Sequence, residues 1–159
     1  MPNVSLRLSM QQQAQTQWCW AAVAASIAGF YNSRSAHSQC STVCAVLPDS
    51  SCCANGASPR CNVPDSLERA LKYVTHWAST LQGSPTWTRI DQELSAHHPV
   101  GVLVRLLGGS GHFVAISGTG AAKSQVLTVE DPFQGRTTTT LAQYAKSAHG
   151  VWAETYFTR

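Results

Sequence analysis

Apolar residues recur at helical spacing in a long run in the first part of the chain and in two shorter stretches later on. From Cys19 to Tyr31 nearly every residue is apolar or small, which predicts a helix that is buried on all sides. Pro64 suits a first helical turn, and the apolar residues after it recur at helical spacing, namely Leu67, Ala70, Leu71 and Val74. A further short helix, with Ile90 and Leu94 facing inward, is predicted to end at Pro99.

Period-2 alternation predicts strands at the N-terminus and throughout the last third of the chain. Apolar and polar residues alternate over residues 4–10, as expected for a half-buried strand. Residues 142–148 are expected to form a turn of helix. The remaining strands are predicted, between turn residues, at 100–107, 112–117, 125–130, 137–141 and 151–157. Helices first and an antiparallel sheet afterwards indicate an α+β fold.

The chain of 159 residues has the length of one domain. A break at Gly83-Ser84-Pro85 divides it into two half-domains, a helical half over about 11–83 and a β half over about 84–159. The N-terminal strand 4–10 is expected to join the β half. Hydrophobic content of 43% and charged content of 12% favour a single folded domain over residues 1–159.

Charge and hydropathy exclude several classes of partner. The net charge of +3 comes from scattered residues, so no basic patch predicts nucleic-acid binding. No apolar run approaches the roughly 20 residues that span a bilayer, and the sequence shows no signal peptide. We therefore expect no nucleic acid, no membrane and no cofactor among the partners, and we expect a monomer.

Five of the six cysteines crowd into an irregular, cysteine-rich loop over residues 36–62. Their spacing lacks the paired C-x2-C halves of common zinc sites, so disulfides are favoured over a metal, and no metal site is expected. One of the five must stay free or pair outside the chain, and adjacent Cys52 and Cys53 should bond to different partners. The disulfide candidates are Cys40, Cys44, Cys52, Cys53 and Cys61. Disulfides indicate an oxidising destination, hence a secreted protein or one exported into another cell.

Cys19 stands apart from that group, between Trp18 and Trp20, at the expected start of the buried helix. The unpaired N–H groups and the macrodipole at a helix N-terminus favour a thiolate, which is the nucleophilic form of cysteine. A thiol hydrolase is therefore our working hypothesis for the chain.

A cysteine nucleophile needs a base, and the base needs an orienting acceptor. Among six histidines, His112 follows a glycine-rich turn and begins an apolar strand, which would hold it rigidly beside space for a substrate. Asp131 ends the following strand, so a tight hairpin would bring it next to His112. Taken alone, each residue also fits a plain strand end, and Glu130 is the alternative acid.

The oxyanion of a tetrahedral intermediate needs hydrogen-bond donors. The Cys19 amide can supply one, and a glutamine just upstream can supply another. The residues alone do not choose among five glutamines, which are Gln11, Gln12, Gln13, Gln15 and Gln17.

The order Gln13, Cys19-Trp20, Gly111-His112-Phe113-Val114 and Asp131-Pro132 resembles the papain-like cysteine peptidases. The likeness is to small bacterial members with a Trp-Cys-Trp-Ala-Ala motif, among them avirulence proteases of plant pathogens and, more distantly, the peptidase domains of bacteriocin exporters.

This resemblance implies a papain-like fold and assigns a role to each matching residue. It makes Cys19 the nucleophile, His112 the base, Asp131 the orienting acid and Gln13 the oxyanion donor. The substrate-binding residues that it implies are Trp18, Trp20 and Gly111.

The resulting hypothesis is a secreted bacterial cysteine endopeptidase that cleaves protein or peptide substrates through a thioester acyl-enzyme. Two alternatives stay open: a delivered toxin or effector protease with a specific intracellular target, and a non-catalytic, cysteine-stapled binding module of the same fold. A protein inhibitor or immunity protein is an expected partner.

Overall fold

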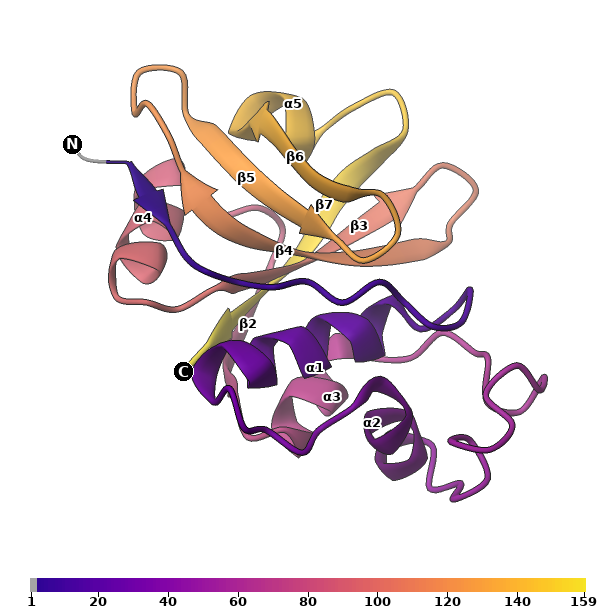
Figure 1. The fold of residues 1–159 in the computed structure, drawn as a ribbon. Coiled ribbons are helices and arrows are strands. Elements are labelled where there is room, and N and C mark those ends of the chain that lie inside the picture. The colour runs from indigo at the N-terminus through magenta and orange to yellow at the C-terminus, as the bar shows by residue number, and fades with distance from the viewer. Residues whose placement is uncertain (1–2) are drawn as a thin grey trace.

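The structure is a computed structural model that describes residues 3–159, with helices packed below an antiparallel sheet (Figure 1). Three helices lie together on one side of the sheet: α1 (Cys19–Tyr31), α2 (Gln39–Val46) and α3 (Leu67–Tyr73). No helix among these described residues is long and apolar enough to cross a membrane.

The strands pair antiparallel in the order β2-β7-β3-β4-β5-β6, and the two-residue β1 (Val4–Ser5) pairs with β4 beside this path. Helix α4 (Trp87–Ser95) packs against β1, β3 and β4, and α5 (Leu141–Ala145) against β6 and β7. The remaining strands are β2 (Trp77–Gln82), β3 (Val100–Leu106), β4 (Gly111–Thr119), β5 (Val126–Asp131), β6 (Gly135–Thr140) and β7 (Gly150–Thr158). This architecture confirms the predicted α+β fold.

Helix α1 is the centre of the helical layer. Its first ten residues, Cys19 to Ala28, are all buried, and none is more than 8% exposed. Small alanines on every side let α2, α3 and β4 approach the helix closely. The prediction of a helix buried all round is confirmed.

The cysteine-rich loop contains a helix that the sequence did not predict. Ser38 caps α2 by accepting a hydrogen bond from the Ser41 amide, while the Ser41 hydroxyl accepts one from the Ser38 amide. This reciprocal capping box stabilises a helix only eight residues long. The sequence contains this capping motif as Ser38-x-x-Ser41, but the clustered cysteines around it favoured an irregular loop.

Two other boundaries differ from the prediction. The N-terminal segment places Leu6 and Leu8 in the core, as its alternation predicts, but only β1 and the Leu6 amide bond to β4, so residues 7–10 are extended without being a strand. Strand β2 belongs to the sheet although it comes before residue 84. The sheet therefore includes a segment that the sequence assigns to the helical half.

Two disulfides cross the cysteine-rich loop, Cys40–Cys53 and Cys52–Cys61. Adjacent Cys52 and Cys53 bond to different partners, as expected. Cys44 is the unpaired member of the group, and its Sγ lies 3.8 Å from the Sγ of Cys53.

This pairing can be tested by peptide mapping of the protein alkylated without reduction. We expect tandem mass spectrometry to find the Cys40–Cys53 and Cys52–Cys61 linkages and to find Cys44 alkylated. A protein reduced before alkylation is the control and should carry the label on every cysteine. Recovery of Cys44 mainly in a disulfide-linked peptide would contradict the arrangement.

Candidate active site

Cys19 is the first residue of α1, at the junction between the helices and the sheet. It forms no disulfide and is 8% exposed. Trp18 occupies the N-cap position, and no side chain caps the helix there. The N–H groups of the first turn are therefore left for another acceptor, which is the environment predicted for a nucleophile.

His112 on β4 and Asp131 on β5 lie close together, as the hairpin predicts. The two strands pair antiparallel, and His112 Nε2 is 2.8 Å from Asp131 Oδ1. The same oxygen accepts the amides of Phe133 at 2.7 Å and Gln134 at 3.1 Å. Since three groups hold this carboxylate, its orientation toward the imidazole is fixed.

The pKa values of this pair move in opposite directions. Burial lowers the pKa of His112, but hydrogen bonds and charge interactions with Asp131 and Cys19 outweigh it and raise the pKa to about 9. Burial also opposes ionisation of Asp131, yet the hydrogen bonds from His112 and Phe133 hold its pKa below the usual value. At neutral pH the pair is therefore an imidazolium and a carboxylate. With Nε2 facing Asp131, Nδ1 is the nitrogen left for Cys19.

Glu130, the alternative acid, points elsewhere. Its carboxylate accepts hydrogen bonds from Ser117 Oγ and from the Arg136 guanidinium, both at 2.7 Å. The structure thus brings Asp131 and not Glu130 to His112.

Gln13 lies in the irregular loop, residues 11–17, that precedes α1. Its Nε2 donates to the carbonyl oxygens of Gln15 at 3.1 Å and Thr16 at 2.9 Å. Its Oε1 is the one buried side-chain nitrogen or oxygen of residues 3–159 that lacks a hydrogen-bond partner. A buried polar atom left unpaired costs about 1–3 kcal/mol, so Gln13 is held in an unfavourable environment.

Trp18 and Trp20 are both buried, and their indoles bind the end of the cysteine-rich loop and the residue directly after it. Trp18 Nε1 donates to the Cys61 carbonyl at 2.8 Å, and Trp20 Nε1 donates to the Val63 carbonyl at 3.0 Å. The ring of Trp18 also lies against Gly56, where a Cβ would come within 2.7 Å of a ring carbon. The two tryptophans thus tie both sides of Cys19 to the segment of residues 61–63, where this loop ends.

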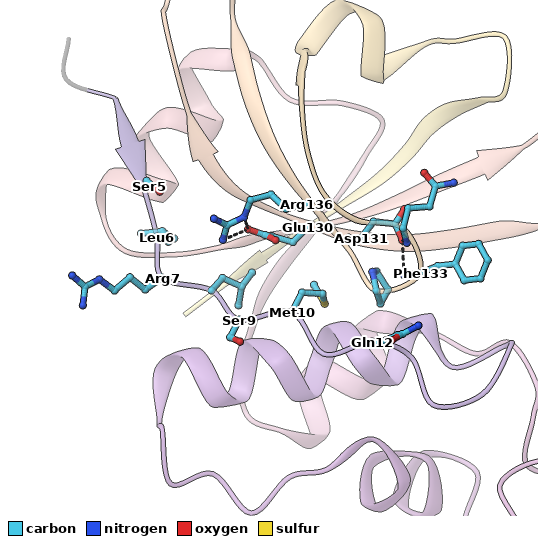
Figure 2. A pocket seen from close by; sticks show the side chains of 14 residues that line it. Ser5, Leu6, Arg7, Ser9, Met10, Gln12, Glu130, Asp131, Phe133 and Arg136 are labelled. Atoms are coloured by element: carbon cyan, nitrogen blue, oxygen red, sulfur yellow. Dashed lines mark hydrogen bonds and ion pairs between the residues drawn. The ribbon is translucent and has the colours of Figure 1, made fainter.

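Two hollows lie beside these residues, one lined by Cys19 and the other by Asp131. Cys19 lines one of about 330 Å³, together with Trp20, Gly111, the residues 64–66 just before α3, and residues from β3 and β7. The other, of about 690 Å³, lies between residues 5–12 and the β5–β6 hairpin, with Asp131 at one end (Figure 2). Trp18 lines neither hollow.

One cluster within residues 3–159 has the spacing of metal ligands, formed by Asp49, Cys52 and Cys61 within 4.8 Å of one another. The two sulfurs are joined in a disulfide, so they are not thiolate ligands.

A family model described as "Papain-like cysteine protease AvrRpt2" matches residues 2–149. The chain belongs to this family. It is therefore a papain-like cysteine protease, and its substrate is a protein or peptide. No curated protein matches the sequence in a pairwise comparison.

One solved structure shares the fold of this AvrRpt2-family protease, and a second is a weaker match. A double glycine motif protease from an AMS/PCAT transporter, solved in complex with the leader peptide, is 13% identical with a TM-score of 0.58, and the match covers 98% of this chain and 94% of that one. The Pseudomonas avirulence protein AvrPphB is 11% identical with a TM-score of 0.43 over 95% and 96% of the two chains.

The sequence did not reveal most of the residues that line the Cys19 hollow. Arg105 and Glu154 lie on β3 and β7, far apart in the sequence, and Asp65 precedes α3. Tyr156 donates a hydrogen bond to Glu154, and burial and this acceptor raise the pKa of the phenol, which stays protonated. The pairing of β3 with β7 brings Arg105 and Glu154 together, so no local pattern marked them.

The raised pKa of His112 gives a test by NMR titration of the labelled imidazole in the intact protease. We expect His112 to stay protonated until the pH approaches about 9. In Asp131→Asn the pKa should fall, because the anion that stabilises the imidazolium is lost. Glu130→Gln is the matched control, since Glu130 does not touch His112. An unchanged titration in Asp131→Asn would show that the carboxylate does not control this histidine.

Proposed function

We propose that this protease cleaves peptide bonds through a triad of Cys19, His112 and Asp131, with Gln13 as oxyanion donor. The hydrogen bond between His112 Nε2 and Asp131 is the observation that carries the proposal. It fixes the imidazole so that Nδ1 is available to the thiol at the start of α1.

Each residue has a defined step. The Cys19 thiolate attacks the scissile carbonyl, and His112 then gives its proton to the leaving amine. The product is a thioester on Cys19. Water attacks this thioester, His112 takes a proton from the water, and release of the carboxylic acid restores the thiolate. Asp131 stays ionised throughout and stabilises the imidazolium.

The uncapped first turn of α1 supports the proposed oxyanion site, because the Cys19 amide is available there. Gln13 would supply the second donor. Its Nε2 now serves the Gln15 and Thr16 carbonyls, so binding the oxyanion exchanges one of these neutral bonds for a charge-assisted one. Gly111 and Trp20, which line the hollow around Cys19, are the proposed substrate contacts.

The two disulfides favour a secreted protein over one that works in a reducing interior. Membership of the AvrRpt2 family favours a second candidate, an effector delivered into another cell. Activity in millimolar glutathione separates the two, because an effector must tolerate a reducing interior and a secreted protease need not.

The triad can be tested with iodoacetamide and a digest of a denatured protein substrate. We expect iodoacetamide to label Cys19 rapidly, and Cys19→Ala to abolish proteolysis, because the nucleophile is lost. His112→Ala should slow the labelling strongly.

Cys44→Ala is the matched control, since Cys44 is the other free thiol of residues 3–159 and does not line the hollow around Cys19. It should keep full activity. Proteolysis that survives Cys19→Ala would overturn the proposed mechanism.

Gln13→Ala should lower kcat by about 10²- to 10³-fold, the usual effect of removing an oxyanion donor. Gln17 is the rival, because it lines the Cys19 hollow, and Gln12 is a control that lines the other one. Steady-state kinetics of the three alanine variants decide among them. A fall of this size in Gln17→Ala, with Gln13→Ala unaffected, would assign the role to Gln17.

A further inference from the structure

The loop of residues 11–17 has no regular structure, yet it carries Gln13 and leads directly into Cys19. Its position cannot come from a helix or strand of its own. One contact ties the loop to the residue after Asp131: the backbone N–H of Gln13 donates to the Pro132 carbonyl at 2.9 Å. Two side-chain amides from elsewhere hold the rest.

Gln39, the first residue of α2, holds the first part of the loop. Its Oε1 accepts the Ala14 amide at 2.8 Å, and its Nε2 donates to the Gln12 carbonyl at 2.9 Å and to Gln11 Oε1 at 3.1 Å. The residue is 8% exposed, so these bonds are shielded from water. Gln39 thus binds the backbone on both sides of Gln13.

Asn62, in the cysteine-rich loop, holds the second part. Its Oδ1 accepts the Gln17 amide at 2.8 Å, and its Nδ2 donates to Thr16 Oγ1 at 2.8 Å. Gln17 lies two residues before Cys19, so Asn62 fixes the entry into α1.

We propose that Gln39 and Asn62 are positioning residues that hold the 11–17 loop in its catalytic geometry. They act through Gln13 and the Cys19 amide and touch no reacting atom; the inference rests on the proposed oxyanion site. A displacement of about 1 Å at a reacting group can cost about 10²-fold in rate, so two amides that fix this backbone contribute to turnover.

The two disulfides also help to hold the 11–17 loop, because they lie next to Gln39 and Asn62. Gln39 directly precedes Cys40, and Asn62 directly follows Cys61, and each of these cysteines is bridged to the middle of the cysteine-rich loop. The bridges therefore fix the two residues that grip the 11–17 loop, and the cysteine-rich loop serves the active site as well as the helical layer.

The decisive variant is Gln39→Met, which keeps the shape of the side chain and loses its hydrogen bonds. We expect kcat to fall about 10- to 100-fold with KM nearly unchanged, because geometry and not substrate binding is disturbed. Affinity for a peptide aldehyde should fall in parallel, since its adduct with Cys19 carries an oxygen in the oxyanion site. The rate of iodoacetamide labelling of Cys19 should not change, because that reaction forms no oxyanion. Gln92→Met, at an exposed helical position on α4, is the matched control and should behave as the unmodified protease.

Asn62→Ala removes the other amide from a half-buried position and should give the same separation of effects. The proposal is overturned if both variants keep the kcat and the aldehyde affinity of the unmodified protease. It is also overturned if iodoacetamide labelling falls in parallel with kcat, because that result indicates general damage to the site. Neither result bears on the proposed triad, which Cys19→Ala and Asp131→Asn test separately.

Discussion

The uncapped N-terminus of α1 meets the imidazolium of His112 where the helices pack on the sheet. A buried helix end without a side-chain cap leaves backbone donors in need of an acceptor, and this end borders the hollow that Cys19 lines. Cys19 is the residue at that end, and the same unpaired N–H groups favour the thiolate form of its side chain. The rest of the molecule can be understood as the support that keeps this junction in place.

On the sheet side, the support is a short turn. Asp131 ends β5 and accepts the Phe133 and Gln134 amides while it faces His112, so the turn orients the carboxylate before any substrate arrives. Burial alone would disfavour both charged groups, and their mutual interaction reverses this for each. The Pro132 carbonyl, next to Asp131, accepts the backbone N–H of Gln13. This bond links the turn that holds the acid to the 11–17 loop.

The parts of this site that sequence predicts are those set by local patterns. The apolar run after Cys19 predicts α1, and a hairpin predicts that His112 and Asp131 meet, since both follow from neighbouring residues. Gln39 and Asn62 were not predicted, because they reach the 11–17 loop across 25 and 45 residues respectively. Only the family resemblance singles out Gln13 as the oxyanion donor. Five glutamines lie in residues 11–17, and their spacing from Cys19 favours none of them. The same limit explains β2, whose place in the sheet depends on β7 at the far end of the chain.

The cysteine-rich loop changes meaning once these long contacts are included. The sequence indicates only that the loop is cross-linked, but in the structure its Cys61 carbonyl accepts the Trp18 indole and its Asn62 holds the chain before Cys19. The Trp20 indole binds Val63, directly after the loop. An irregular segment such as residues 11–17 loses conformational entropy when it is fixed, about 1–2 kcal/mol per residue, and has no ladder of its own to offset this. Side-chain amides mounted on disulfide-bridged segments provide the missing bonds. In a protease of this length, the cross-links are therefore placed where they order the active site.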